Sequence, residues 1–442
     1  MKIYIYVFIA MLLSFLFIDC QAITATEAKE VSKGRILDEN EKLGNFVFRE
    51  NIKTVKIFPE GWELGYPVMD IRESIKLVFS FDDLANESKN YSYTIIHCGS
   101  DWIPSDILQT DYISGFTEAV INQYDFSRNT FRDFIHYTLH IPNEDMRPTL
   151  PGNYILKIYE DFDQSKPVIT RKFYVVDYMV EIEGEAKRSE DMMHFNTGQE
   201  VDFNILHENL HLDDPDKNIR VVVKQNNSDL NSITDLKPTF VQNNVLIYNY
   251  EEENRFNGLS EFRDFDTKNL KYITERVDRV VFQRPYQHVY LLPDRVRSID
   301  NYDFYEDLNG NFFIKWDEGN ISDLDADYVM MHFNLPFDAP LPGADVYIYG
   351  GLSNWALQPE LKMEYNLKTR AYELVCPLKQ GLYNYQYVFV PENAPVDFTF
   401  FEGSHFETEN DYLIFVYYQD FRKRYETLVG FKILNTIEKS QQ

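Results

Sequence analysis

Cysteine is scarce in this sequence. Only 3 of the 442 residues are cysteine, and Cys98 and Cys376 stand far apart in the chain. Such a small number of cysteines excludes a framework of disulfide bonds. Both residues lie in or beside apolar runs, where buried free thiols are typical. A hydrophobic core must therefore hold the fold together.

Glycine is also sparse, and helical periodicity is hard to find. The chain has 18 glycines against 31 tyrosines and 34 phenylalanines, and aromatic residues favour β-strands. Short alternating segments, such as residues 75–81, 91–97 and 154–159, are separated by turn residues. A chain of 442 residues is too long for one ordinary core. The sequence therefore predicts an all-β protein of tandem immunoglobulin-like or early-set β-sandwich domains.

Basic residues are few. Lys and Arg total 43 against 71 Asp and Glu, which gives a net charge of −28 at pH 7. A charge of this sign repels nucleic acid phosphates and anionic lipid headgroups. The acidic residues are spread along the whole chain, as is typical of a soluble surface. Nucleic acid is therefore excluded as a partner.

Long hydrophobic runs are absent after the N-terminus. Residues 3–18 form an apolar run followed by polar sequence, which is the pattern of an export signal. Ala22 suits a signal-peptidase site, and we expect a signal peptide over residues 1–22. The alternative is lipidation of Cys20, although Asp19 does not suit a lipobox. A run of about 16 apolar residues falls short of the roughly 20 that span a bilayer, so no integral membrane segment is expected in the mature chain.

The rest of the chain divides into consecutive units. We expect a polar segment at 23–44, a first β-sandwich domain at 45–178, a second β-sandwich domain with long loops at 179–325, and a C-terminal early-set-like β-sandwich domain at 326–442. No low-complexity stretch separates these units. We therefore expect them to pack against one another and not to swing on flexible tethers.

One candidate nucleophile is Cys98, which follows His97 and lies near Asp101. A thiol activated by an imidazole is a common catalytic arrangement. Adjacent residues of a strand, however, point to opposite faces. We therefore expect a structural role for His97 and Cys98.

Two segments offer residue types that ligate metals. His207 and His211 have a spacing that places two imidazoles on one helical face, but the Asn, Asp and Pro around them favour a solvated turn. Asp323, Asp325 and Asp327 present oxygens to calcium in principle, but the glycine and distal glutamate of a helical calcium loop are missing. We expect no metal at either segment.

Recognisable catalytic motifs are absent as well. The sequence has no Gly-x-Ser-x-Gly, no phosphate-binding glycine loop and no dinucleotide fingerprint. With 71 acidic residues, no catalytic carboxylate pair stands out. We expect a non-enzymatic protein without cofactors, and the sequence does not indicate which residues bind a partner.

Short motifs in the first 180 residues resemble a known family. They are Gly61-Trp62-Glu63-Leu64-Gly65-Tyr66-Pro67, Leu77-Val78-Phe79-Ser80-Phe81-Asp82-Asp83-Leu84, Asp101-Trp102-x-Pro104-Ser105-Asp106, Pro142-Asn143-Glu144-Asp145 and Gly152-Asn153-Tyr154. In order and spacing they resemble the first domain of the type IX secretion system plug protein family of Bacteroidetes. The resemblance continues through Glu261-Phe262-Arg263, Asp307-x-Asn309-Gly310 and Lys379-Gln380-Gly381, and covers about residues 45–430.

This resemblance implies a location and a partner. It implies a periplasmic subunit, peripherally associated with the outer membrane, that takes part in protein secretion. The subunit would bind the outer-membrane type IX translocon barrel and plug its periplasmic opening when no cargo passes. Composition permits this function but does not indicate it.

The third unit has a second, looser similarity. Residues 346–355 and 381–387 look like glycan-binding modules of the early-set sandwich type, in which an aromatic platform stacks on sugar rings. Trp355 is the aromatic residue that matches, while the further binding positions do not. The alternative function is therefore an exported carbohydrate-binding protein that uses the C-terminal sandwich. In the competing interpretation, Trp355 is a packing residue in a sandwich reused for protein contacts.

Overall fold

The computed structural model describes residues 43–85 and 87–437. The predicted signal peptide at 1–22 and the alternative lipid attachment at Cys20 lie outside these residues, as does nearly all of the polar segment at 23–44. Within the described part of the chain, no helix is both long and apolar enough to cross a membrane.

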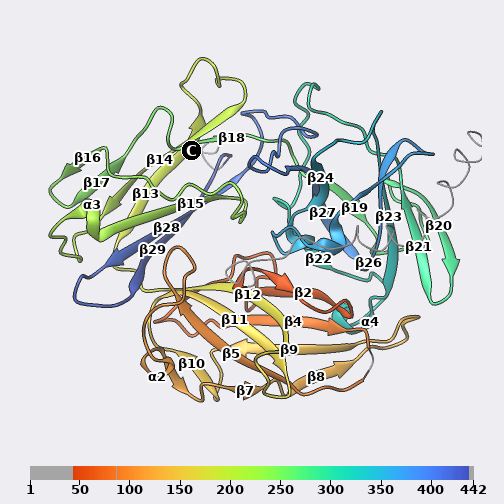
Figure 1. Ribbon diagram of the computed structural model, residues 1–442, viewed down its shortest axis with the longest axis horizontal. Coiled ribbons are helices and arrows are strands. Elements are labelled where there is room, and N and C mark those ends of the chain that lie inside the picture. The colour runs from red at the N-terminus through yellow and green to blue at the C-terminus, as the bar shows by residue number, and fades with distance from the viewer. Residues whose placement is uncertain (1–42, 86, 438–442) are drawn as a thin grey trace, which may run out of the picture. The chain divides into compact units, whose positions relative to one another are not determined.

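Strands make up almost all of the regular structure (Figure 1). The α-helices of the described residues are single turns, namely α2 (Gln109–Tyr112), α3 (Pro215–Asn218) and α4 (Ser322–Asp325). Two short 3-10 helices accompany them, η3 (Gly351–Ser353) and η4 (Pro359–Leu361). The described strands form three β-sandwiches, so the prediction of an all-β protein of tandem sandwiches is confirmed.

The first of these, the N-terminal sandwich, spans residues 46–176. Its strands are β1 (Phe46–Val47), β2 (Ile52–Pro59), β3 (Val68–Asp70), β4 (Leu77–Asp83), β5 (Tyr91–Cys98), β6 (Ile113–Gly115), β7 (Ala119–Val120), β8 (Gln123–Phe126), β9 (Ile135–Ile141), β10 (Met146–Pro148), β11 (Gly152–Glu160) and β12 (Pro167–Val176). One sheet has the order β1-β12-β11-β5-β7, with β3 parallel to β12, and it faces a sheet of order β2-β4-β9-β8 across a shared apolar core. A separate ribbon joins β6 and β10.

The middle sandwich is assembled from two distant parts of the chain. Its strands are β13 (Glu181–Arg188), β14 (Gly198–Leu206), β15 (Ile219–Gln225), β16 (Phe240–Gln242), β17 (Val245–Tyr248), β18 (Arg255–Asn257), β28 (Asp411–Gln419) and β29 (Glu426–Asn435). One sheet has the order β13-β14-β17-β16, with β18 added to β14, and the other has the order β15-β28-β29.

The inserted sandwich lies in the sequence between β18 and β28. Its strands are β19 (Arg263–Asp266), β20 (Val277–Gln283), β21 (Tyr286–Leu291), β22 (Phe312–Ile314), β23 (Tyr328–Pro336), β24 (Ala344–Tyr349), β25 (Glu364–Asn366), β26 (Ala371–Lys379) and β27 (Gly381–Pro391). A sheet of order β20-β21-β23-β26-β25 faces a sheet of order β19-β27-β22, with β24 paired to β27.

This strand pairing differs from the expected division between 179–325 and 326–442. β28 and β29 fall in the range expected for the C-terminal domain, but β28 pairs with β15 along its length, and Figure 1 shows these dark blue strands beside green β15. Conversely, β19, β21 and β22 contribute Phe265, Val289 and Ile314 to the core of the inserted sandwich. The physical reason for the difference is that the alternation of apolar residues in a sequence predicts a strand but does not indicate which other strand pairs with it.

β12 and β28 are buried on both faces. Phe173 and Val175 of β12 belong to the core of the N-terminal sandwich. Tyr174 and Val176, which alternate with them, belong instead to an apolar cluster that includes Phe415 of β28, because successive side chains of a strand point to opposite faces. The rings of Tyr174 and Phe415 stack with their centroids 4.3 Å apart. The N-terminal and middle sandwiches therefore pack against each other, as the sequence predicted.

Candidate functional site

The surroundings of the candidate nucleophile Cys98 do not favour a reactive thiolate. His97 and Cys98 are adjacent in β5 and both are buried. The imidazole lies 2.8 Å from Ser105 Oγ, and burial lowers the pKa of His97 to about 4. Burial also raises the pKa of the Cys98 thiol to about 12. A neutral imidazole and a protonated thiol cannot form the ion pair that activates a cysteine nucleophile.

The two predicted histidines do not come together on a helix. His207 is buried, and its Nδ1 lies 3.0 Å from the carbonyl oxygen of Leu210. The side chain of His211 is 90% exposed and pairs with Asp213 at 3.2 Å. Residues 207–211 form a turn. In residues 43–85 and 87–437, no group of three or more His, Cys, Asp and Glu is arranged to hold a metal ion.

The three aspartates near α4 have separate protein partners. Asp323 Oδ1 accepts a hydrogen bond from Lys56 Nζ at 2.9 Å. Asp325 Oδ2 accepts from the backbone N–H of Ile321 at 2.9 Å. Asp327 accepts from backbone N–H groups, including that of Phe131 at 2.7 Å. These carboxylates therefore accept hydrogen bonds in local turns or form an ion pair, and they are not grouped around a shared cation.

Trp355 is a packing residue. It is 6% exposed and belongs to an apolar cluster. Its ring meets the rings of Phe262 and Tyr349 edge-on, with centroids 6.1 and 5.8 Å apart. A ring enclosed in this way does not offer a platform for a sugar, and it does not support the carbohydrate-binding alternative.

A buried ion pair joins the N-terminal and inserted sandwiches. Lys379 Nζ, at the end of β26, donates to Asp82 Oδ2 on β4 at 2.6 Å, and both side chains are fully buried. The hydroxyl of Tyr328 donates to the same oxygen at 2.6 Å. His136 Nδ1 lies 2.6 Å from Asp82 Oδ1. Although burial opposes ionisation, Lys379 and His136 lower the pKa of Asp82, so the carboxylate is charged at neutral pH.

A second ion cluster extends this junction. Lys56 Nζ on β2 lies 2.9 Å from Glu63 Oε1 and 2.9 Å from Asp323 Oδ1. Burial of Asp323 opposes its ionisation, but the Lys56 ammonium lowers the pKa of Asp323 to about 2. Since Lys379 also donates to the backbone carbonyl of Asp323, the two clusters are connected. The junction of the N-terminal and inserted sandwiches is therefore fixed by the fully buried Asp82–Lys379 pair and by the buried Lys56, whose partners Glu63 and Asp323 remain partly exposed.

Polar contacts also hold the middle sandwich to the N-terminal sandwich. Tyr66 donates to Asp411 Oδ2 at 2.7 Å, and Tyr417 donates to Asn153 Oδ1 at 2.7 Å. The Asp229 carboxylate lies 2.8 Å from Lys172 Nζ of β12 and also accepts from Lys224 of β15. Tyr66 and Tyr417 belong to the same apolar cluster as Tyr174 and Phe415, so these bonds add directional contacts to it.

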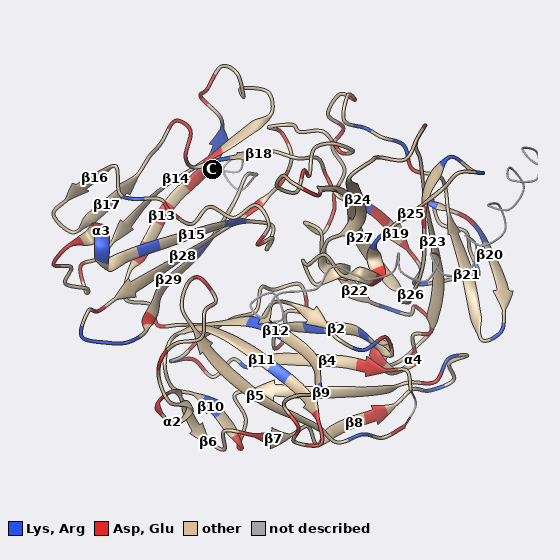
Figure 2. Ribbon diagram, in the orientation of Figure 1, with Lys and Arg blue, Asp and Glu red and all other residues tan. Residues whose placement is uncertain are grey.

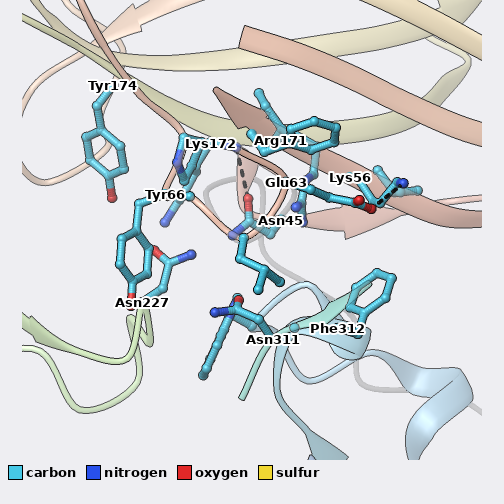
Figure 3. A pocket seen from close by; sticks show the side chains of 18 of the residues that line it. Asn45, Lys56, Glu63, Tyr66, Arg171, Lys172, Tyr174, Asn227, Asn311 and Phe312 are labelled. Carbon is cyan, nitrogen blue, oxygen red and sulfur yellow. Dashed lines mark hydrogen bonds and ion pairs between the residues drawn. The ribbon is translucent and has the colours of Figure 1, made fainter. Parts of the chain in front are cut away.

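A polar cavity of about 60 Å³ lies where the three sandwiches meet. Figure 3 shows Arg171 and Lys172 of the N-terminal sandwich, Asn227 of the middle sandwich and Asn311 of the inserted sandwich around it. The Nε and Nη1 groups of Arg171 have no hydrogen-bond partner in the described part of the chain, and burial lowers the pKa of Arg171 to about 10. The cavity is large enough for a few water molecules and too small for a substrate.

We expect Asp229→Asn to destabilise the protein in a pH-dependent way. Burial opposes ionisation of Asp229, but Lys172 and Lys224 lower its pKa below the unfolded value of about 4. The ionised form therefore stabilises the fold above about pH 4. This contribution is lost progressively as the pH falls below that value. The Asp229 side chain is 30% exposed, so solvent limits the loss to about 1–3 kcal/mol at pH 7.

Urea unfolding at pH 7, 5 and 3.5 measures this effect. The difference between wild type and Asp229→Asn should shrink as the pH falls below about 5. Asp106→Asn is the control, because the Asp106 side chain is 93% exposed. A difference that stays constant over this pH range would contradict the assignment.

The sequence contains a local signal for the buried charges. Asp82 directly follows Phe81 near the end of β4, and Lys56 lies between apolar neighbours in β2, so charged residues stand beside buried apolar ones in both strands (Figure 2). Lys and Asp are almost never fully buried unless they are paired. Their pairing across two sandwiches could not be read from the sequence, because the partners are distant in the chain.

Comparisons with known proteins agree with this architecture. A family model described as the type 9 secretion system plug protein 1st domain matches residues 52–177. The crystal structure of a hypothetical protein from Parabacteroides merdae is 32% identical with a TM-score of 0.86, over 89% of this chain and 99% of that chain. Dimeric latent PorU from Porphyromonas gingivalis is 9% identical with a TM-score of 0.14, over 87% of this chain and 34% of that chain, which is too low for a shared fold. None of the curated proteins matches the chain.

The family match falls on the N-terminal sandwich, and the similar crystal structure extends the likeness over all three sandwiches. The family is of a structural, non-catalytic kind with a role in type IX secretion, and no enzyme family is indicated. The chain therefore belongs to the type IX secretion system plug protein family.

Proposed function

We propose that this protein is a non-enzymatic periplasmic subunit that binds the outer-membrane type IX translocon barrel and closes its periplasmic opening. The observation that carries the proposal is the locking of three sandwiches into one body through the buried Asp82–Lys379 pair and the apolar layer around Phe415. A plug that acts by obstruction has to keep its shape. Flexibly tethered domains would leave passages between them.

A wide barrel opening would need more than one sandwich to cover it. One sandwich of about 130 residues has a radius of gyration near 14 Å and is roughly 35 Å across. Barrel diameter grows with strand number, and the largest known membrane barrels have about 36 strands. A single sandwich would leave a gap in so wide an opening, whereas three fixed sandwiches cover more of it.

Cell permeability tests the proposal. A deletion strain should become more sensitive to large antibiotics that intact outer membranes exclude, while cargo secretion continues at least in part. Expression of the full chain should restore exclusion, and the barrel should co-purify with the protein. Unchanged permeability in the deletion strain would overturn the plug function. Co-purification without any permeability change would indicate a bound subunit that does not obstruct.

A further inference from the structure

A cleft of about 580 Å³ opens in the inserted sandwich. This volume lies in the range of pockets that enclose a ligand group. The charged side chains that line it are Glu261, Arg263, Asp264, Glu275, Arg276, Asp294, Arg295, Arg297, Asp300, Asp303 and Glu306. Carboxylates therefore outnumber guanidinium groups on its walls.

The arginines of the cleft are already paired. Arg263 lies 3.1 Å from Asp294 and 2.9 Å from the fully buried Glu402. Arg297 also binds Glu402, at 2.6 Å, and Arg295 lies 2.6 Å from Asp300. The remaining arginine, at position 276, pairs with Asp294 as well. Arg263 and Arg297 are thus held in the wall of the cleft by buried carboxylates, whereas the Arg295 side chain remains 78% exposed.

Other carboxylates of the cleft have no basic partner. Glu261, Asp264, Glu275, Asp303 and Glu306 form no ion pair with any of the described residues. Glu275, Asp303 and Glu306 are exposed at the cleft. Burial raises the pKa of both Glu261 and Asp264, and the nearby Arg297 and Arg276 only partly oppose this shift.

Glu261 lines the cleft and carries an acceptor that the described protein groups do not use. It is 2% exposed, and its Oε1 accepts hydrogen bonds from Tyr302 at 2.6 Å and from the backbone N–H of Glu409 at 3.2 Å. Its Oε2 has no hydrogen-bond partner among residues 43–85 and 87–437. Leaving a buried carboxylate oxygen without a donor is unfavourable. A cationic donor that enters the cleft would remove this deficit.

We propose that this cleft binds an arginine side chain on an exposed segment of a partner protein. The unpaired carboxylates supply the opposite charge, and the rings of Tyr302 and Tyr305, which also line the cleft, offer surfaces on which a planar guanidinium stacks. The cleft lies within one sandwich, so it is independent of the locking of the three sandwiches. It can bind its partner whether or not the protein acts as a plug.

Fluorescence anisotropy with the full chain tests the site. The probe is a labelled Gly-Arg-Gly-Arg-Gly peptide, and the reference is the same peptide with citrulline, a neutral isostere, at both arginine positions. We expect citrulline to weaken binding about tenfold or more, and Glu261→Gln to do the same for the arginine peptide. Equal binding of the two peptides would overturn the proposal.

A second pair of variants separates the cleft from general charge attraction. Asp303→Asn combined with Glu306→Gln removes two negative charges at exposed positions of the cleft, where folding is not at risk. Asp106→Asn combined with Asp338→Asn removes two charges elsewhere, from side chains that are 93% and 99% exposed. The cleft pair should weaken binding about tenfold and the control pair less than about twofold. Equal losses would overturn the proposal, because the peptide would then respond to net charge alone.

Discussion

Replacing Asp82 by alanine is expected to lower the free energy of unfolding by about 3–5 kcal/mol. The substitution leaves the Lys379 ammonium fully buried without its counter-charge, and it also removes the acceptor of the Tyr328 hydroxyl. An unpaired buried charge is among the most destabilising changes that a single substitution produces. Because the pair joins two sandwiches, hydrogen exchange should rise first in the strands that carry it, β4 and β26.

Urea unfolding at pH 7 provides the measurement. Asp125→Ala is the matched control, since Asp125 lies exposed on β8 at the edge of the same sheet, and its loss should stay within about 0.5 kcal/mol. Asp82→Leu combined with Lys379→Met should recover much of the stability, because apolar residues of similar volume replace buried ion pairs with little loss. A single Asp82→Ala variant as stable as the control would refute the role of this pair.

Glu402→Gln should have an effect of similar size in the inserted sandwich. Glu402 is fully buried and accepts from Arg263 Nη2 at 2.9 Å, from Arg297 Nε at 2.6 Å and from the backbone N–H of Tyr387 at 2.9 Å. A neutral amide at this position leaves the guanidinium groups of Arg263 and Arg297 without the counter-charge of Glu402. We expect a loss of about 3–5 kcal/mol at pH 7.

The pH dependence of this loss follows from the pKa of Glu402. Burial opposes its ionisation, but Arg263 and Arg297 lower its pKa to about 2, below the unfolded value of about 4.3. The contribution of the ionised form is therefore complete above about pH 5 and is lost as the pH falls towards 2. Thermal unfolding of wild type and Glu402→Gln should converge in acid, with the exposed Glu407→Gln as control. A constant gap between the two curves down to acid pH would argue against an ion pair at this position.

The positions of the strands were largely predictable, whereas their partners were not. The predicted segments at 91–97 and 154–159 lie within β5 and β11, because alternating apolar residues are a local signal. The pairing of β15 with β28 depends on residues that are far apart in the sequence. A strand buried on both faces, such as β28, reads as a continuous apolar run in any sandwich, so the sequence could not assign it to the middle one.

The candidate sites show the same contrast. Strand alternation indicated from the sequence that His97 and Cys98 point to opposite faces, since that argument needs only neighbouring residues of one strand. The Asp82–Lys379 pair and the carboxylates around Glu261 depend on loops and strands that meet only in the folded protein. A buried charge can be suspected from an apolar neighbourhood, but its counter-charge is fixed by the fold.

Because one sandwich is inserted into another, the middle sandwich can be completed only at the end of synthesis. β13 to β18 emerge first, the whole inserted sandwich follows, and β28 and β29 come last. Until then, Val221 and Val223 lack the strand that pairs beside them, and Tyr174 lacks the ring of Phe415. A chain that stops before Asp411 thus exposes apolar surface on two sandwiches at once, the feature that chaperones recognise in unfinished proteins. Burial of these apolar faces therefore depends on complete synthesis of the chain. Only a chain that has reached β29 can cover the residues of β12 and β15, which were made about 200 residues earlier.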